Sequence, residues 1–367
     1  MTTIGNEKYC NESSGTVAEV VLGVDTHLDV HLAVALDHLG RRLSTFSVPT
    51  TQQGYESLLT WAAGFGPVRC AGVEGTSSYG AGLARHLRAM GIAVVEVERP
   101  KRRHLRRKGK SDPIDAEAAA RAVLSGEAAG VPKSADGRVE MIRTLRSARC
   151  SAVKARSQAA NQLQGFVVTA PEEIRHRLRE LTTKKLVRVA ARMRPGKDPD
   201  DVEAATKFAL RSVARRYQAL SREIADLDAQ LDRLVAEAAP ELISLPAIGT
   251  DHAATLLLTV GDNPERLKSE ASFASLCGVS PVEASSGKVV RHRLNRGGNR
   301  DANRALHLIC VVRMRIDERT RRYVARRTAE GKSRREIMRC LKRYIAREVY
   351  RVVLSAASPP PIGVSTT

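Results

Sequence analysis

The sequence predicts an α/β fold in which a mixed sheet with flanking helices is followed by a coiled-coil helix and a mainly α-helical C-terminal part. Two observations support this prediction. Short runs rich in Val and Leu alternate with helical patterns in the first third of the chain. Further along, eight apolar residues between Leu210 and Leu234 repeat with spacings of three and four, the pattern of a coiled-coil seam.

The order of the predicted elements indicates the type of sheet. The strands are expected at 20–24, 30–35, 42–48, 68–73 and 92–97, with helices at 52–63 and 79–90. The first three strands follow one another closely enough for an antiparallel meander, and the later strands alternate with helices. This combination implies a mixed sheet covered by helices. It matches the ribonuclease-H-like arrangement.

Composition indicates a partner that is a polyanion. The chain has 367 residues, with 60 Lys and Arg against 40 Asp and Glu, and a formal charge of +20. Nucleic acid is the leading candidate, and a merely soluble basic protein is the alternative. The six cysteines are dispersed without a Cys-x-x-Cys pair, which argues against a zinc ribbon and a disulfide framework. No run approaches the roughly 20 apolar residues of a membrane span, so we expect a cytoplasmic protein without membrane contact.

Breaks in the pattern divide the chain into five expected parts. Loop-forming residues around 192–201 and the change of character after Pro240 separate the helical stretches. The expected parts are a disordered lead at 1–17, a catalytic α/β domain at 18–165, a helical linker and coiled coil at 166–238, a C-terminal domain at 239–354 with a helix-hairpin-helix-like turn, and a disordered tail at 355–367. The turn at 245–249 precedes a helix whose first N–H groups could hold a phosphate.

Four acidic residues form the most informative pattern in the chain. Asp25 and Glu74 each end an expected strand, and Asp112 and Asp115 stand three residues apart, on one face of a helix. Carboxylate oxygens are the ligands that Mg²⁺ and Mn²⁺ prefer. The four acids are therefore predicted to hold Mg²⁺ or Mn²⁺ for phosphodiester chemistry.

Each acid also has a simpler interpretation. Ser111 or Asp112 could cap a helix, with Pro113 at its first position and Asp115 in its first turn. On that motif alone, helix capping is favoured. Asp25 and Glu74 could be turn residues, and a strand-end Asp also occurs in actin-like sugar kinases. The order and spacing of all four acids in a basic chain favour the metal site.

Two basic stretches are predicted to bind nucleic acid. Lys and Arg make up seven of the eleven residues from 100 to 110, directly before Asp112. A run this dense is usually an exposed loop, and it would hold DNA phosphates near the metals. A second stretch follows Gly287. The expected contacts are Lys101, Arg102, Arg103, Arg106, Arg107, Lys108, Lys110, Arg291, Arg293 and Arg296.

The heptad pattern from 210 to 234 has two interpretations. A two-stranded coiled coil between chains predicts a homodimer or a higher homo-oligomer. The alternative is a helix packed inside its own chain, as an antiparallel hairpin with residues 140–165. Periodicity favours the first interpretation slightly.

Several motifs resemble one family of proteins. The segments that resemble its Asp-Glu-Asp-Asp motifs are Gly23–His27, Val73–Tyr79 and Lys110–Ala116. The C-terminal segments that match are Leu245–Gly249, Phe273–Pro281 and Ser286-Gly287. The family is that of the transposases of insertion-sequence family 110, with the related Piv-type DNA invertases. The resemblance runs from about Val20 to about Leu354, with Ala247 where the family usually has glycine.

The resemblance implies a fold and an activity. It implies a RuvC-like domain that carries Asp25, Glu74, Asp112 and Asp115, then a coiled coil, then a transposase domain with a nucleophilic serine. The serine precedes a glycine, which selects Ser286, with Ser285 as the neighbouring ambiguity. Without the resemblance, this Ser-Ser-Gly turn would be interpreted as a plain surface loop.

The resemblance also implies DNA as the substrate and a structured guide RNA as a partner. Aromatic residues are only 4% of the chain, too few for extensive base stacking. Arginine-rich surfaces suit backbone and shape recognition of folded RNA and duplex DNA. Sequence choice would then be left to base pairing.

Three alternatives to a serine recombinase stay open. One is a RuvC-like nuclease that uses water and leaves Ser286 idle. Another is a non-catalytic dimeric protein that compacts or bridges DNA. The third, an actin-like ATPase, is disfavoured because its phosphate loops need glycine-rich motifs that the stretch from Glu74 to Gly80 matches poorly.

Overall fold

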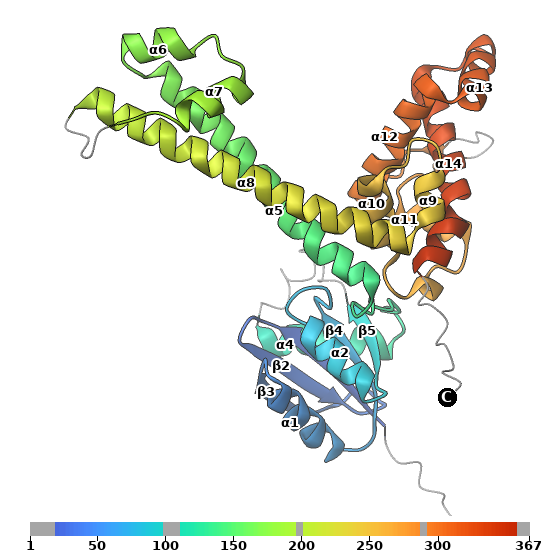
Figure 1. The fold of residues 1–367 in the computed structure, drawn as a ribbon. Helices are drawn as coiled ribbons and strands as arrows, with labels where there is room; N and C mark the ends of the chain where they lie inside the picture. Colours follow the sequence, from blue (N-terminus) through green and yellow to red (C-terminus); the bar gives the residue numbers. More distant parts are fainter. Residues whose placement is uncertain (1–18, 98–110, 196–200, 287–291, 358–367) are drawn as a thin grey trace, which may run out of the picture. The chain divides into compact units, whose positions relative to one another are not determined.

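The computed structural model describes residues 19–97, 111–195, 201–286 and 292–357 (Figure 1). The expected lead at 1–17 and residues 358–367 of the expected tail lie outside these ranges. The chain divides into two compact units, one up to Ala135 and one from Asp136 onward. Within the described ranges, every helix is too short or too polar to cross a membrane.

The first unit is built on a mixed five-stranded sheet. Its strands are β1 (Val20–Thr26), β2 (Val30–Leu36), β3 (Arg42–Pro49), β4 (Val68–Glu74) and β5 (Ala93–Val97). Their order is β3-β2-β1-β4-β5, in which the first three strands form an antiparallel meander and β4 and β5 run parallel to β1. All seven residues of the central strand β1 are buried, as expected for a strand covered on both faces.

Helices cover both faces of this sheet (Figure 1). On one face, α1 (Gln52–Ala63) and α2 (Ala81–Ala89) bury Leu58 and Leu83 against Leu22 and Val24. On the other face, α4 (Asp112–Leu124) buries small alanines against β1 and β2. The meander, the mixed sheet and its helices are confirmed, and the arrangement is consistent with a ribonuclease-H-like α/β fold.

The second unit begins with a long helical hairpin. Helix α5 (Arg138–Val168) runs up to two short helices, α6 (Glu172–Leu178) and α7 (Thr183–Ala190), and α8 (Val202–Ala238) returns alongside it (Figure 1). The heptad-bearing helix α8 therefore packs on α5 of the same chain. This agrees with the second interpretation, an antiparallel hairpin within the chain.

The rest of the second unit is a helical domain with its own core. Its elements are α9 (Pro240–Ser244), α10 (Thr250–Val260), η1 (Pro264–Arg266), α11 (Glu270–Leu276), β6 (Val282–Glu283), β7 (His292–Arg293), α12 (Arg300–Ile316), α13 (Glu318–Ala329) and α14 (Arg334–Ala357). Buried apolar residues of α10, α12 and α14 form one cluster around Phe273 of α11 and also include Leu231 and Leu234 of α8.

The units do not divide where the sequence pattern placed a boundary. The expected boundary at 165 falls inside α5, and α5 packs along α8. By its contacts, α5 therefore belongs with the helical second unit and not with the sheet. The expected tail also begins later, because α14 continues to Ala357.

Candidate active site

Two glycines bring α4 against the sheet. A Cβ atom on Gly23 of β1 would lie 2.0 Å from the carbonyl oxygen of Ala116, and one on Gly72 of β4 would lie 2.8 Å from that of Ala119. Such distances are far below van der Waals contact, so only glycine allows the helix backbone to come this close. The close approach places the first turn of α4 near the C-terminal end of β1.

Asp25 and Glu74 end neighbouring strands of the sheet. Val24 of β1 pairs with Val73 of β4 in a parallel register, so the next residue on each strand is an acid. Asp25 is only 7% exposed, and Glu74 is half-buried. The hydroxyl of Thr26 donates a hydrogen bond of 2.9 Å to the Glu74 carbonyl oxygen. This bond ties the two strand ends together.

Asp112 and Asp115 lie in the first turn of α4. Ser111 occupies the N-cap position, but its side chain makes no capping hydrogen bond, and Asp112 is the first residue of the helix. Pro113 stands in the first turn, as the capping interpretation expected. The carboxylate of Asp112 instead lies near His27, with 3.6 Å between Asp112 Oδ2 and His27 Nε2.

His27 joins the acids at the end of β1. Its Nε2 lies 3.2 Å from Asp25 Oδ2, and potential ligand atoms of Asp25, His27 and Asp112 all lie within 4.8 Å of one another. Among the described residues, Glu74 and Asp115 are not part of this compact group. Sequence reasoning missed His27, for which the Asp-x-His spacing is only a weak signal, since residues two apart at a strand end face the same side.

The electrostatics of the group favour a cation. Burial raises the pKa of the Asp25 carboxyl, and the negative charges of Asp112 and Asp115 raise it further, while His27 opposes them. Asp115 therefore acts on Asp25 although it lies outside the compact group. Ionised carboxylates in this arrangement repel one another, and a divalent ion would remove the repulsion. Two carboxylates and an imidazole are a suitable donor set for such an ion.

The expected nucleophile lies on an exposed turn of the second unit. Strands β6 and β7 pair in antiparallel fashion, with Val282 opposite Arg293. Ser285 and Ser286 follow β6 on the connection between the two strands, and both are exposed. A macromolecular substrate can therefore reach the Ser286 hydroxyl.

Glycines hold the two ends of the segment that carries Ser286. Gly278 has φ +65°, and a Cβ there would lie 2.7 Å from the Gly297 carbonyl oxygen. A Cβ on Gly298, which has φ +85°, would lie 2.6 Å from the carbonyl oxygen of Leu276. Both glycines are required by the close approach and by their left-handed backbone. The start and the end of the segment from 278 to 298 therefore meet at the end of α11.

Asn303 of α12 completes this attachment. Its side-chain NH₂ donates hydrogen bonds of 3.0 Å to the carbonyl oxygens of Cys277 and Gly278. Lys342 of α14 donates a bond of 2.6 Å to the Asn303 Oδ1 atom, which fixes the orientation of the amide. Burial lowers the pKa of the Lys342 ammonium group. Asn303 therefore links the serine-bearing segment to the core helices.

Two of the ten expected nucleic-acid contacts, Arg293 and Arg296, lie among the described residues. Those between Lys101 and Lys110 lie outside the described residues, as does Arg291. Arg293 and Arg296 are exposed on the C-terminal side of the serine turn.

The turn at 245–249 is held by a hydrogen bond from a buried, ion-paired arginine. Ala247 has φ +63°, in the left-handed region that favours glycine. Arg313, almost fully buried, donates to the Pro246 carbonyl oxygen at 2.9 Å and pairs with Glu348 at 2.6 Å. The turn is therefore fixed from α12 and α14.

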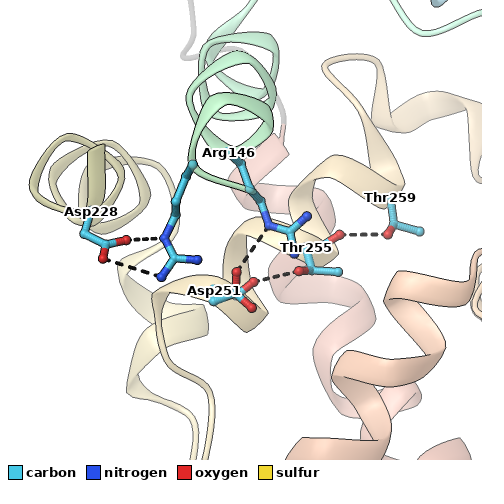
Figure 2. A network of polar contacts seen from close by, with 6 residues as sticks. Arg146, Asp228, Asp251, Thr255 and Thr259 are labelled. Atoms are coloured by element: carbon cyan, nitrogen blue, oxygen red, sulfur yellow. Dashed lines mark hydrogen bonds and ion pairs between the residues drawn. The ribbon is translucent and has the colours of Figure 1, made fainter. Parts of the chain in front are cut away.

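A polar network fixes the helix after this turn (Figure 2). Arg146 of α5 pairs with Asp251 in the first turn of α10, and the Thr255 hydroxyl donates to the Asp251 carbonyl oxygen. Arg149, also on α5, pairs with Asp228 of α8. The phosphate-binding role expected at the start of α10 stays a prediction.

Comparisons with known proteins identify the family. A family model described as "Transposase", for DEDD transposases of IS110, matches residues 22–170, and one described as "Transposase IS116/IS110/IS902 family" matches residues 239–325. Together they cover more than half of the chain, including the four acids and Ser286.

Three curated proteins match parts of the chain. An insertion element IS110 uncharacterized 43.6 kDa protein of Streptomyces coelicolor is 35% identical over 36% of this chain and 33% of its own length. The putative transposase y4pF/y4sB of Sinorhizobium fredii is 30% identical over 53% of this chain and 48% of its own length. An insertion element IS900 uncharacterized 42 kDa protein of Mycobacterium paratuberculosis is 29% identical over 36% and 34%.

The matched part of the chain thus spans about a third to a half of the length of these relatives. The two family models match the segments that carry the acid-bearing strands and the serine turn. The chain therefore belongs to the IS110 family of transposases.

Proposed function

We propose that the protein is a DNA transposase or site-specific recombinase that cuts and rejoins DNA strands. The observation that carries this proposal is the convergence of Asp25 and Asp112, from segments far apart in sequence, on one group of potential metal ligands. Family membership and the charge of +20 support it. Asp115, in the first turn of α4, and Glu74, at the end of β4, complete the proposed RuvC-like acidic site.

The acids and the serine have separate roles in this proposal. Mg²⁺ or Mn²⁺, when bound, would stabilise negative charge on the phosphate oxygens. Asp25 and Asp112 would hold the ion, and Asp115 and Glu74 would keep the site negative. Ser286 Oγ would attack the phosphorus and form a phosphoester with one DNA end, while the other end leaves as a hydroxyl that takes up the serine proton. Attack by a hydroxyl of a second strand would reverse these steps and rejoin the DNA.

A trapping experiment on DNA tests the nucleophile. We expect denaturing gels to show a covalent protein–DNA adduct with wild type and with Ser285→Ala, and no adduct with Ser286→Ala. Ser285 is the matched control because it is the neighbouring hydroxyl on the same exposed turn. Free cleaved ends from both wild type and Ser286→Ala, with no adduct, would favour the nuclease that uses water.

A second experiment separates catalysis from binding. If the protein only bridges DNA, Asp25→Ala and Asp115→Asn should leave every activity intact, because binding would rest on phosphate contacts. In the proposed enzyme both variants still bind DNA and lose cleavage. Gel-shift and cleavage assays on the same samples distinguish the two cases.

Self-association and a guide RNA are further parts of the proposal. The heptad side chains Val213, Tyr217, Leu220 and Leu227 are only partly buried, which leaves apolar surface for a homodimer through 210–234. Arginine-rich surfaces of the chain support a structured guide RNA, and the DNA beside the gene should then encode a foldable non-coding segment. Sedimentation that gives a monomer at every concentration would contradict the dimer.

A further inference from the structure

We propose that His27 is a ligand of the metal ion and that it shifts the metal preference of the site from Mg²⁺ toward Mn²⁺ and later transition metals. The proposal deepens the proposed function and rests on it, since it concerns the same acidic site. Neither the Asp-Glu-Asp-Asp pattern nor the family match assigns a role to this histidine.

The position of the imidazole carries the proposal. His27 Nε2 lies between two carboxylates, 3.2 Å from Asp25 Oδ2 and 3.6 Å from Asp112 Oδ2. The three side chains come from the end of β1 and the first turn of α4. Their ligand atoms fit within 4.8 Å of one another, a spacing that a single ion can bridge. The same nitrogen that contacts both acids is thus placed to bind the ion that they hold.

Exposure separates His27 from a structural histidine. The side chain is 52% exposed, so its location is not explained by core packing. The side chain of Asp25, by contrast, is 10% exposed and that of Asp112 is 53% exposed. One buried and one exposed carboxylate with an exposed imidazole form a site that opens to solvent on the His27 side. A metal ion and a DNA phosphate could enter from that side.

Donor chemistry determines the consequence for the metal. Mg²⁺ binds oxygen ligands and keeps much of its water, whereas imidazole nitrogen suits transition metals. A nitrogen ligand should therefore contribute more to Mn²⁺ binding than to Mg²⁺ binding. Loss of groups that only orient a ligand typically lowers metal affinity about 10–100-fold, so loss of a direct ligand should cost at least about 10-fold.

Spectroscopy on the full-length protein tests this directly. Pulsed electron paramagnetic resonance of bound Mn²⁺ detects a coupling to ¹⁴N when an imidazole is coordinated. We expect this coupling in wild type and its loss in His27→Gln. His38→Gln is the matched control, because His38 is an exposed histidine of the same unit in the turn between β2 and β3. It should keep the coupling.

Calorimetric titration adds the metal preference. We expect His27→Gln to weaken Mn²⁺ binding at least about 10-fold and Mg²⁺ binding much less, and His38→Gln to change neither. Wild-type Mn²⁺ without nitrogen coupling, or equal Mn²⁺ affinity of wild type and His27→Gln, would overturn the assignment.

Asp25→Asn separates this assignment from the proposed function. If Asp25→Asn loses Mn²⁺ binding while His27→Gln keeps it, the metal site stands and only the role of His27 is wrong. If wild type binds neither metal ion, the metal part of the proposed function fails together with the role of His27.

Discussion

The fold of the first unit destabilises the charged form of Asp25. Burial and two neighbouring acids raise the pKa of the Asp25 carboxyl. The protonated carboxyl therefore stabilises the fold below the usual pKa of an aspartate, and this stabilisation is lost as pH rises through the raised pKa. At neutral pH without metal, the ionised group therefore opposes folding. Such a loss of stability at residues that serve function is common at active sites.

An asparagine at position 25, which has the same shape but no charge, should remove this destabilisation. We predict that Asp25→Asn raises the melting temperature at pH 7 in the presence of a chelator, because it removes a poorly solvated charge next to Asp112 and Asp115. Added Mn²⁺ should stabilise wild type and not the variant. Calorimetry with and without metal measures both effects, and a lower melting temperature for Asp25→Asn in chelator would contradict the prediction.

The buried His31 of β2 should make the folded protein less stable in weak acid. It is fully buried, stacks on Tyr55 at 5.9 Å between ring centroids, and its ring nitrogens have no hydrogen-bond partner among the described residues. Burial lowers its pKa, with a smaller effect from His27. The neutral form is favoured in the fold, so stability is present above about pH 6.5 and is lost as pH falls toward the lowered pKa.

Replacement of His31 by phenylalanine should reduce the dependence of protein stability on pH. We expect the urea midpoint of wild type to fall between pH 6.5 and pH 5, and that of His31→Phe to change less over the same range, with the stacking on Tyr55 kept. His38→Gln, at an exposed position, should behave like wild type. Equal pH profiles for wild type and His31→Phe would show that another group is responsible.

At the scale of elements, the contact between α4 and β1 decides whether the acids meet. We predict that Gly23→Ala destabilises the first unit by about 3 kcal/mol, because its Cβ would clash with the Ala116 carbonyl oxygen. It should also weaken Mn²⁺ binding by displacing Asp112. As a control, Gly165→Ala in α5 has open space around its Cβ and should gain about 0.5–1 kcal/mol in urea unfolding.

A substitution in the turn before α10 should raise the free energy of unfolding, in contrast to Gly23→Ala. Ala247 occupies a left-handed backbone conformation, at the position where the family usually has glycine. We expect Ala247→Gly to stabilise the second unit by about 0.5–1 kcal/mol, because the Cβ strain disappears. Ala229→Gly, on the exposed side of α8, should instead cost about 1 kcal/mol. Chemical denaturation compares the two variants, and destabilisation by both would contradict strain at Ala247.

The strands and helices of the first unit were predictable at the element scale. The Val-rich runs and the turn residues between them indicate the meander, and alternation with helices indicates the parallel strands. The compact group at Asp25 was predictable in part, because two of its three members, Asp25 and Asp112, are among the four acids that the sequence pattern singles out. His27 was missed because a short Asp-x-His spacing carries little information until the first turn of α4 lies beside it.

For the whole molecule, the proposed chemistry assigns the acids and Ser286 to different compact units of one chain. If a working site takes them from different subunits, mixing Asp25→Ala with Ser286→Ala protein should restore part of the recombination activity that each lacks alone. The measurement is strand transfer by the mixture after co-refolding. Activity that is never restored at any ratio would make shared sites untenable.

The sequence by itself determined the alternation of strands and helices, the four acids, the basic charge and the family motifs, because periodicity and residue chemistry are local properties of the chain. The tertiary structure alone decided which surface covers each apolar face. The heptads of α8 pack on α5 of the same chain, and α5 joins the second unit rather than the sheet. It also decided that His27 meets Asp25 and Asp112. A repeat shows which side of a helix is apolar, but only long-range packing selects the partner.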